Sequence, residues 1–231
     1  MNKATFYRFF FYVSGLLILS MGLTLNTKAG LGVSPIISVP YSLSTIFYFN
    51  FGNATLVYYC FFVILELLLH CIYIKKSGIK NNIKLILLMD VLQIPLSIAF
   101  TRFLNLFAFL LPTFSSDTNE QFVLRLIVLI FAIVFTGVGA AMSLSMRLVP
   151  NPGDGIVQAI ADGIHKSVGF TKNCFDILNI SITTGLSLLI ANQIVGIGIG
   201  TLIAMIGVGR IMALYHHFTQ KKISKLTNMA Y

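Results

Sequence analysis

Charged residues are scarce in this chain. Only 10% of its 231 residues are charged and 57% are hydrophobic, whereas soluble domains carry about 25% charged residues. So few polar groups cannot cover a water-soluble globule, which excludes an ordinary soluble domain and indicates a lipid environment. Acidic residues are the rarest, with 7 against 16 lysines and arginines and a net charge of +9.

Cysteine is rare and tryptophan is absent. The three cysteines, Cys60, Cys71 and Cys174, lie in or beside apolar segments, without Cys-x-x-Cys or Cys/His spacing. We therefore expect no disulfide framework, no metal site and no cofactor. The chain also has no phosphate loop, nucleophile elbow or metalloprotease motif, so we expect that it is not an enzyme.

Six apolar runs are long enough to cross a bilayer, which takes about 20 helical residues. They cover approximately residues 8–26, 55–74, 85–111, 122–146, 172–191 and 195–218. The first run is longer than the core of a signal peptide, and no small-residue cleavage site follows it. We therefore expect this run to be retained as the first membrane helix.

The basic residues are distributed unevenly between the two sides of these spans. With the N-terminus inside, the inner segments hold 12 lysines and arginines, four of them in the loop 75–84. The outer loops hold Lys28, with Arg102 and Arg125 near outer helix ends. The positive-inside rule therefore predicts that both termini are cytoplasmic, and it explains the basic charge by lipid headgroups rather than nucleic acid.

Two short segments begin with a proline. Ser34-Pro35 opens the apolar segment 34–47, and Asn151-Pro152 opens the segment 152–166. Serine or asparagine as N-cap, followed by proline at the first helical position, is typical of a helix start. Both segments are too short or too interrupted for a straight span, so we expect re-entrant or interfacial helices.

A shift of 117 positions matches the first half of the chain with the second. It takes Arg8 to Arg125 and Pro35 to Pro152. Each half has three spans, an odd number, so the second half must lie upside down relative to the first. The expected fold is an all-α membrane protein with six transmembrane helices in two inverted-topology three-helix repeats. Each repeat contains a short Pro-led re-entrant or interfacial helix.

The repeat also predicts the division of the chain. The first repeat would span residues 1–111 and the second residues 122–218, joined by an outer loop at 112–121. Residues 219–231 would form a basic cytoplasmic tail.

Two stretches of the sequence resemble a known family. Lys28-Ala29-Gly30-Leu31-Gly32-Val33-Ser34-Pro35 and Asn151-Pro152-Gly153-Asp154-Gly155 are similar to the bacterial integral membrane proteins grouped as YczE/YyaS/YitT-like. The resemblance extends over most of the chain, and these stretches are its distinctive parts. It implies a small multi-pass protein of a bacterial plasma membrane, and it transfers no functional residue to this chain.

Asp154 is the most specific candidate for a binding residue. It occupies the third position of a helix that Asn151 would cap, which fits a purely local capping role. The flanking Gly153 and Gly155 would instead let the backbone approach a bound group. Both interpretations stay open.

Three charged residues, Glu66, Asp90 and Arg210, fall within predicted spans, where a charge marks function or pairing. Asp90 and Arg210 lie at similar depths from the inner ends of their spans, so we expect a structural ion pair. Glu66 and His70 share one helix face. They would form either a proton-relay pair or a neutral hydrogen-bonded pair.

These features favour a transporter or permease for a small solute, with a site between the two repeats. The expected lining residues are Ser34, Glu66, Asn151, Gly153 and Asp154. The alternative is a non-transporting accessory or scaffold protein, whose basic loop 75–84 would dock on a partner. The expected partners are the lipid bilayer and a small solute, with no nucleic acid, whereas a protein partner or homo-oligomer is neither predicted nor excluded.

Overall fold

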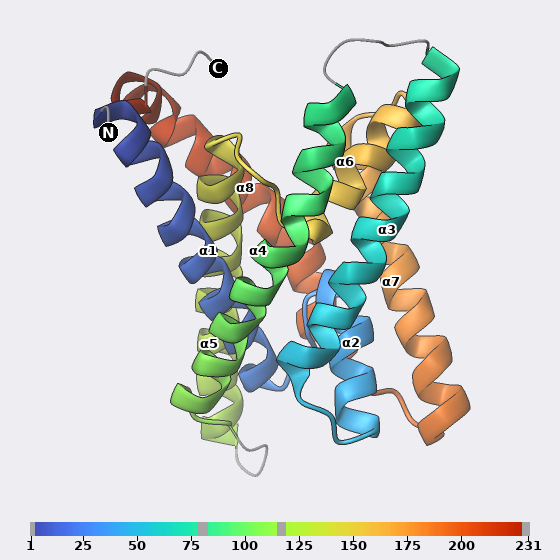
Figure 1. Ribbon diagram of the computed structural model, residues 1–231. Coiled ribbons are helices and arrows are strands. Elements are labelled where there is room, and N and C mark those ends of the chain that lie inside the picture. Colours follow the sequence, from blue (N-terminus) through green and yellow to red (C-terminus); the bar gives the residue numbers. More distant parts are fainter. Residues whose placement is uncertain (1–2, 78–82, 115–118, 228–231) are drawn as a thin grey trace. The chain divides into compact units, whose positions relative to one another are not determined.

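Helices account for all the regular secondary structure of the computed structural model within residues 3–77, 83–114 and 119–227, which it describes (Figure 1). They are α1 (Lys3–Ala29), α2 (Pro35–Ile46), α3 (Phe51–Ser77), α4 (Ile83–Leu110), α5 (Asn119–Ser145), α6 (Pro152–Ile164), α7 (Val168–Ala191) and α8 (Ile199–Thr227). Parts of the predicted basic loop, outer loop and basic tail lie outside the described residues.

Six of these helices are long and apolar enough to cross a membrane: α1, α3, α4, α5, α7 and α8. They correspond to the six predicted spans and indicate a multi-pass membrane protein. The two short helices, α2 and α6, begin at Pro35 and Pro152 as predicted. Two details differ from the sequence-based boundaries. α2 continues through Pro40, and α8 begins at Ile199 and extends to Thr227, beyond the predicted end at 218.

Many polar side chains are buried and many large apolar ones are exposed, unlike in a water-soluble protein. Gln93, Thr101 and Thr183 are fully buried, whereas Phe109 and Leu189 are more than 80% exposed. In lipid, apolar side chains face the hydrocarbon while buried hydroxyl and amide groups bond between or within helices. This distribution therefore agrees with a lipid environment for the long helices.

The chain forms two compact units, and each draws on both halves of the sequence. Unit 1 comprises Met1–Ser34, Phe103–Leu148 and Gly196–Tyr231, and unit 2 comprises Pro35–Arg102 and Val149–Val195. Unit 1 is therefore built mainly from α1, α5 and α8. Unit 2 contains α2, α3, α6, α7 and the first part of α4.

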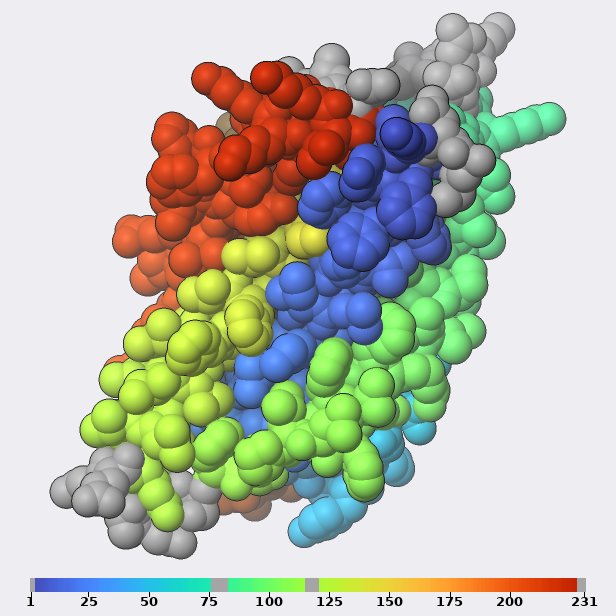
Figure 2. Space-filling view, turned by 90° about the vertical axis from the view of Figure 1, so that its left-hand side faces the viewer, coloured from blue at the N-terminus to red at the C-terminus, as the bar shows by residue number. Residues whose placement is uncertain are grey.

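In unit 1, α1 and α5 pack against each other along their length, with α8 beside α5 (Figure 2). Arg8, near the start of α1, donates to the carbonyl of Met146 after the end of α5, at 2.9 Å. Arg125, near the start of α5, donates from Nε to the carbonyl of Ala29 at the end of α1, at 2.7 Å, and also binds the carbonyl of Gly30. The two helices are thus antiparallel, and each arginine satisfies carbonyls at the other helix's C-terminal end.

Glycines set the distance between α1 and α5. A Cβ at Gly22 would lie 2.4 Å from the backbone nitrogen of Thr136, and one at Gly139 would lie 2.3 Å from that of Leu19. Only glycine permits such an approach of two backbones, which is a common way for membrane helices to pack.

In unit 2, α2 packs on α7 through hydroxyl groups. Ser38 and Thr183 form a hydrogen bond of 2.7 Å, and one turn further on Ser42 and Ser187 form another of 2.7 Å. All four residues are at most 1% exposed. Since these hydroxyls satisfy one another, the α2–α7 interface is closed by direct side-chain bonds.

The second short helix, α6, packs on both α3 and α7 of the same unit. Asn151 caps its first turn by accepting a hydrogen bond from the backbone nitrogen of Gly153, at 3.2 Å. His165 ends it in the left-handed conformation, with φ of 54°. The predicted cap by Asn151 and proline at the first helical position is therefore confirmed.

Candidate functional site

Glu66 is a buried acidic side chain of unit 2, near the middle of the spanning helix α3. It is only 3% exposed. Its Oε1 accepts a hydrogen bond of 2.9 Å from Nε2 of Gln93, which is fully buried on α4. Burying an ionisable group in a membrane helix is unfavourable and usually serves a function. Glu66 is thus held in a defined position inside the unit.

A second polar pair lies one helical turn away on the same two helices. Nδ1 of His70 on α3 is 2.8 Å from Oδ2 of Asp90 on α4, and the Asp90 side chain is 3% exposed. His70 and Glu66 share a face of α3, while Asp90 and Gln93 share a face of α4, because each pair is separated by about one turn. We name Glu66, His70, Asp90 and Gln93 the polar cluster.

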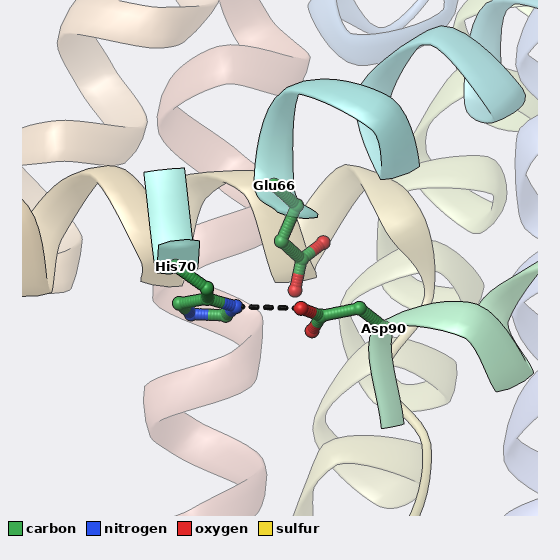
Figure 3. Close-up of side chains that lie close together, drawn as sticks. All are labelled: Glu66, His70 and Asp90. Atoms are coloured by element: carbon green, nitrogen blue, oxygen red, sulfur yellow. Dashed lines mark hydrogen bonds and ion pairs between the residues drawn. The ribbon is translucent and has the colours of Figure 1, made fainter. Parts of the chain in front are cut away.

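The ionisable side chains of the polar cluster converge. Figure 3 shows Glu66, His70 and Asp90 pointing toward one another from α3 and α4. One nitrogen or oxygen atom from each lies within 4.8 Å of those of the other two. Among the described residues, neither Oε2 of Glu66 nor Oε1 of Gln93 has a hydrogen-bond partner, although both atoms are buried. The cluster therefore has spare ligand atoms.

Gly155 of α6 completes the surroundings of the polar cluster. A Cβ at this position would lie 2.6 Å from Oε2 of Glu66 and 3.0 Å from Nε2 of Gln93. The absence of a side chain thus makes room for the carboxylate next to the first turn of α6. The group that Gly155 approaches is a side chain of α3, and the predicted approach of the backbone to a bound group stays a prediction.

Asp154 belongs to a second polar group of unit 2. Burial raises the pKa of its carboxyl above the usual range, and Lys172 partly opposes this while Asp176 adds to it. Lys172 itself forms an ion pair of 3.3 Å with Asp176 at the start of α7, and the Asp176 side chain is 1% exposed. The backbone nitrogen of Asp154 bonds the Asn151 carbonyl at 2.8 Å, as expected for a first helical turn. Asp154 therefore lies near Lys172, and its backbone takes part in the capped first turn of α6.

The remaining predicted lining residues lie outside the polar cluster. Asn151 is the N-cap of α6, and a Cβ at Gly153 would lie 2.9 Å from the Ile36 side chain of α2. Ser34, 7% exposed, is the last residue of the first segment of unit 1. Of the five predicted lining residues, Glu66 is the one in the polar cluster, and the binding role of the set stays a prediction.

The predicted pair of Asp90 with Arg210 joins residues of different units, and it stays a prediction. The partner that the structure shows for Asp90 is His70. His70 therefore bonds the carboxylate of α4, whereas Glu66, its neighbour on α3, bonds the amide of Gln93.

A family model matches residues 6–217, which is most of the chain. The chain belongs to the DUF6198 family. This family is described as one of unknown function, and the match supports no more specific grouping, so YczE/YyaS/YitT-like stays a resemblance of two stretches. No curated protein and no solved structure matches the chain. The family match thus covers most of the helical region but gives no function, so the function has to be inferred from the residues of the site.

The sequence interpretation missed the role of Gln93 and the pairing of His70 with Asp90. The signal was present, because Asp90 and Gln93 are three apart in a span, as Glu66 and His70 are four apart in the preceding one. Two polar pairs with helical spacing in consecutive spans indicate facing polar stripes.

Proposed function

We propose that this protein is a transporter or permease for a small solute, with its site where α3 of the first repeat meets α6 of the second. One observation carries the proposal: Glu66 is buried in a spanning helix, and its carboxylate lies against the first turn of α6 at Gly155. Intramembrane carboxylates mark substrate or ion pathways by default. A helix N-terminus beside such a carboxylate supplies partial positive charge.

The inverted repeat, which we retain as part of the proposal, is supported by pairs of equivalent contacts. The shift of 117 positions relates Arg8 to Arg125, and these arginines bind carbonyls at the ends of α5 and α1 in a reciprocal way. The same shift relates Gly22 to Gly139, whose near neighbours, Thr136 and Leu19, are related by it too. Such reciprocity is expected of two antiparallel helices exchanged by a two-fold axis, as in transporter folds built from inverted repeats.

The shift also relates two interfaces that differ in chemistry. Ser38 and Thr183, which bond to each other between α2 and α7, correspond to Gly155 and Glu66, which meet between α6 and α3. The first interface is sealed by hydroxyl groups that satisfy each other. The second places an ionisable side chain against a glycine and leaves Oε2 of Glu66 without a hydrogen-bond donor among the residues described. This inequality favours the α3–α6 interface as the functional one.

Solute binding can be tested by replacing Glu66 with glutamine. We expect one member of a panel of amino acids, sugars, nucleosides and organic acids to raise the melting temperature of the purified wild-type protein. At 100 times its dissociation constant, a ligand adds about 2.7 kcal/mol of stability. Glu66→Gln should abolish this shift, because glutamine preserves the shape but lacks the charge. Uptake of the labelled solute into proteoliposomes should fall to the level of empty vesicles.

The matched control is Asp162→Asn, which alters an exposed carboxylate of α6 that binds Gln158 at 3.0 Å. This variant should keep both the thermal shift and the uptake. A protein that is stabilised by none of the solutes and moves none of them into vesicles would disprove the transporter proposal.

We also propose that the protein lies in a bacterial plasma membrane with both termini in the cytoplasm. The 12 lysines and arginines of the inner segments support this orientation. Fluorescent-protein fusions at either terminus should fluoresce in a bacterial host, while alkaline phosphatase fusions there should be inactive. Active phosphatase at either terminus would contradict the orientation.

A further inference from the structure

The polar cluster brings together three side chains that can bind a metal ion. Glu66 and Asp90 offer carboxylate oxygens and His70 offers a ring nitrogen, all within 4.8 Å of one another (Figure 3). Three ligands at about 2.1 Å from one ion would lie about 3–3.5 Å apart. Small side-chain rotations would therefore close this set around an ion. The 2.8 Å between Nδ1 of His70 and Oδ2 of Asp90 is already close to that separation.

The charges of the polar cluster also call for a cation. Among the described residues of unit 2, His70 bonds Asp90 and Lys172 pairs with Asp176, so no lysine or arginine of this unit pairs with Glu66 or Asp90. Among the described residues, Oε2 of Glu66 has no hydrogen-bond donor, although Glu66 is only 3% exposed. A divalent ion would balance two carboxylates beside a neutral imidazole, and it would occupy this free oxygen.

The ligand types select the class of ion. Magnesium and calcium prefer shells made only of oxygen, whereas an imidazole nitrogen with carboxylates suits zinc, manganese, iron or cobalt. We propose that Glu66, His70 and Asp90 bind one divalent first-row transition-metal ion, with Gln93 holding Glu66 in position. This proposal departs from the expectation based on cysteine spacing, because the ligands come from two helices and contain no sulfur.

Gly155 fits this role. A Cβ there would lie 2.6 Å from Oε2 of Glu66, which is the oxygen that has no donor. A larger residue would push the carboxylate out of position, so glycine at the first turn of α6 keeps the free oxygen in place.

The direct test is metal binding by the full-length protein in detergent after treatment with a chelator. Titration with Zn²⁺ in a calorimeter should give one site per chain, and Co²⁺ should give visible absorption bands that Zn²⁺ abolishes. X-ray absorption at the zinc edge should show a shell of nitrogen and oxygen ligands that includes one imidazole and no sulfur. His70→Gln and Asp90→Asn should each weaken binding more than about 100-fold, beyond the effect typical of residues that only support a ligand.

Control variants separate this site from adventitious binding. The double variant His216→Gln/His217→Gln removes the two adjacent histidines of α8 and should leave the Zn²⁺ affinity unchanged. Gln93→Leu should weaken Zn²⁺ binding about 10–100-fold while the ligand set seen by X-ray absorption stays the same. Mg²⁺ and Ca²⁺ should not displace Co²⁺ at millimolar concentration.

Two results would overturn the metal site. One is the absence of stoichiometric Zn²⁺ and Co²⁺ binding, which would mean that protons, and no metal ion, neutralise the carboxylates of the cluster. The other is binding that both His70→Gln and Asp90→Asn retain at full affinity while they stay folded by circular dichroism. The metal site goes beyond solute transport, and its binding is measured without transport. Failure of the metal titration therefore leaves the transport proposal standing, and failure of the transport assay leaves the metal site standing.

Discussion

Replacing Gly139 with valine is expected to lower the free energy of unfolding by about 3 kcal/mol. Any Cβ at this position would lie 2.3 Å from the backbone nitrogen of Leu19 and 2.7 Å from the carbonyl oxygen of Gly15. Because both obstacles are backbone atoms of α1, no side-chain rotation can relieve the clash, and α1 and α5 would have to separate. Unfolding of the detergent-purified protein, followed by circular dichroism against temperature or denaturant, measures the loss.

Gly209→Ala is the matched control within unit 1. A Cβ at Gly209 meets no atom within 4 Å, and alanine favours a helix over glycine by about 1 kcal/mol. This variant should be as stable as the wild type or slightly more so. Gly22→Val should behave like Gly139→Val, since its Cβ would lie 2.4 Å from the backbone nitrogen of Thr136. Wild-type stability of both valine variants would contradict the close approach of α1 and α5.

Replacing Lys172 with methionine is expected to lower the free energy of unfolding by about 3 kcal/mol, the low end for a buried pair, because the Lys172 side chain is 25% exposed. Nζ of Lys172 lies 3.3 Å from Oδ2 of Asp176, a side chain that is 1% exposed. Without the lysine, this carboxylate would stay buried without its cation. The midpoint of denaturant unfolding in detergent provides the measurement.

The double variant Lys172→Met/Asp176→Leu tests the cause of that loss. Replacing both members of a buried ion pair by apolar residues is often neutral, so most of the lost stability should return. The coupling between the two changes follows from a double-mutant cycle with Asp176→Leu alone. If the losses of the single variants simply added in the double variant, the uncompensated carboxylate would not be the cause.

The six long helices and the two short ones can be predicted from sequence because each depends on local features. A run of about 20 apolar residues is long enough to cross a bilayer wherever it occurs. Pro35 and Pro152 have no backbone N–H to lose at a helix start, so they mark the first residues of α2 and α6. The end of α8 cannot be predicted in the same way, because the helix continues to Thr227 through polar residues that lack an apolar pattern.

The partners of the intramembrane charges could not be predicted in this way. Depth in the membrane predicts Arg210 as a partner of Asp90, and this pair stays a prediction. His70 lies at a similar depth, since it precedes the same inner loop that Asp90 follows. The choice depends on which faces of α3 and α4 meet, and the structure places His70 2.8 Å from Asp90. Depth alone thus leaves the contact of His70 with Asp90 unpredicted, and the tertiary structure shows it.

By itself, the sequence determined the apolar composition that indicates a lipid environment, the number of long apolar helices and the starts of the short ones, because composition, run length and proline act locally. Only the tertiary structure decided that Glu66, His70 and Asp90 converge, and that Gly155 leaves room for the carboxylate. These contacts join α3, α4 and α6, and they arise from the rotation and distance of packed helices. A one-dimensional pattern specifies neither quantity, so the chemistry of the site becomes visible only after packing.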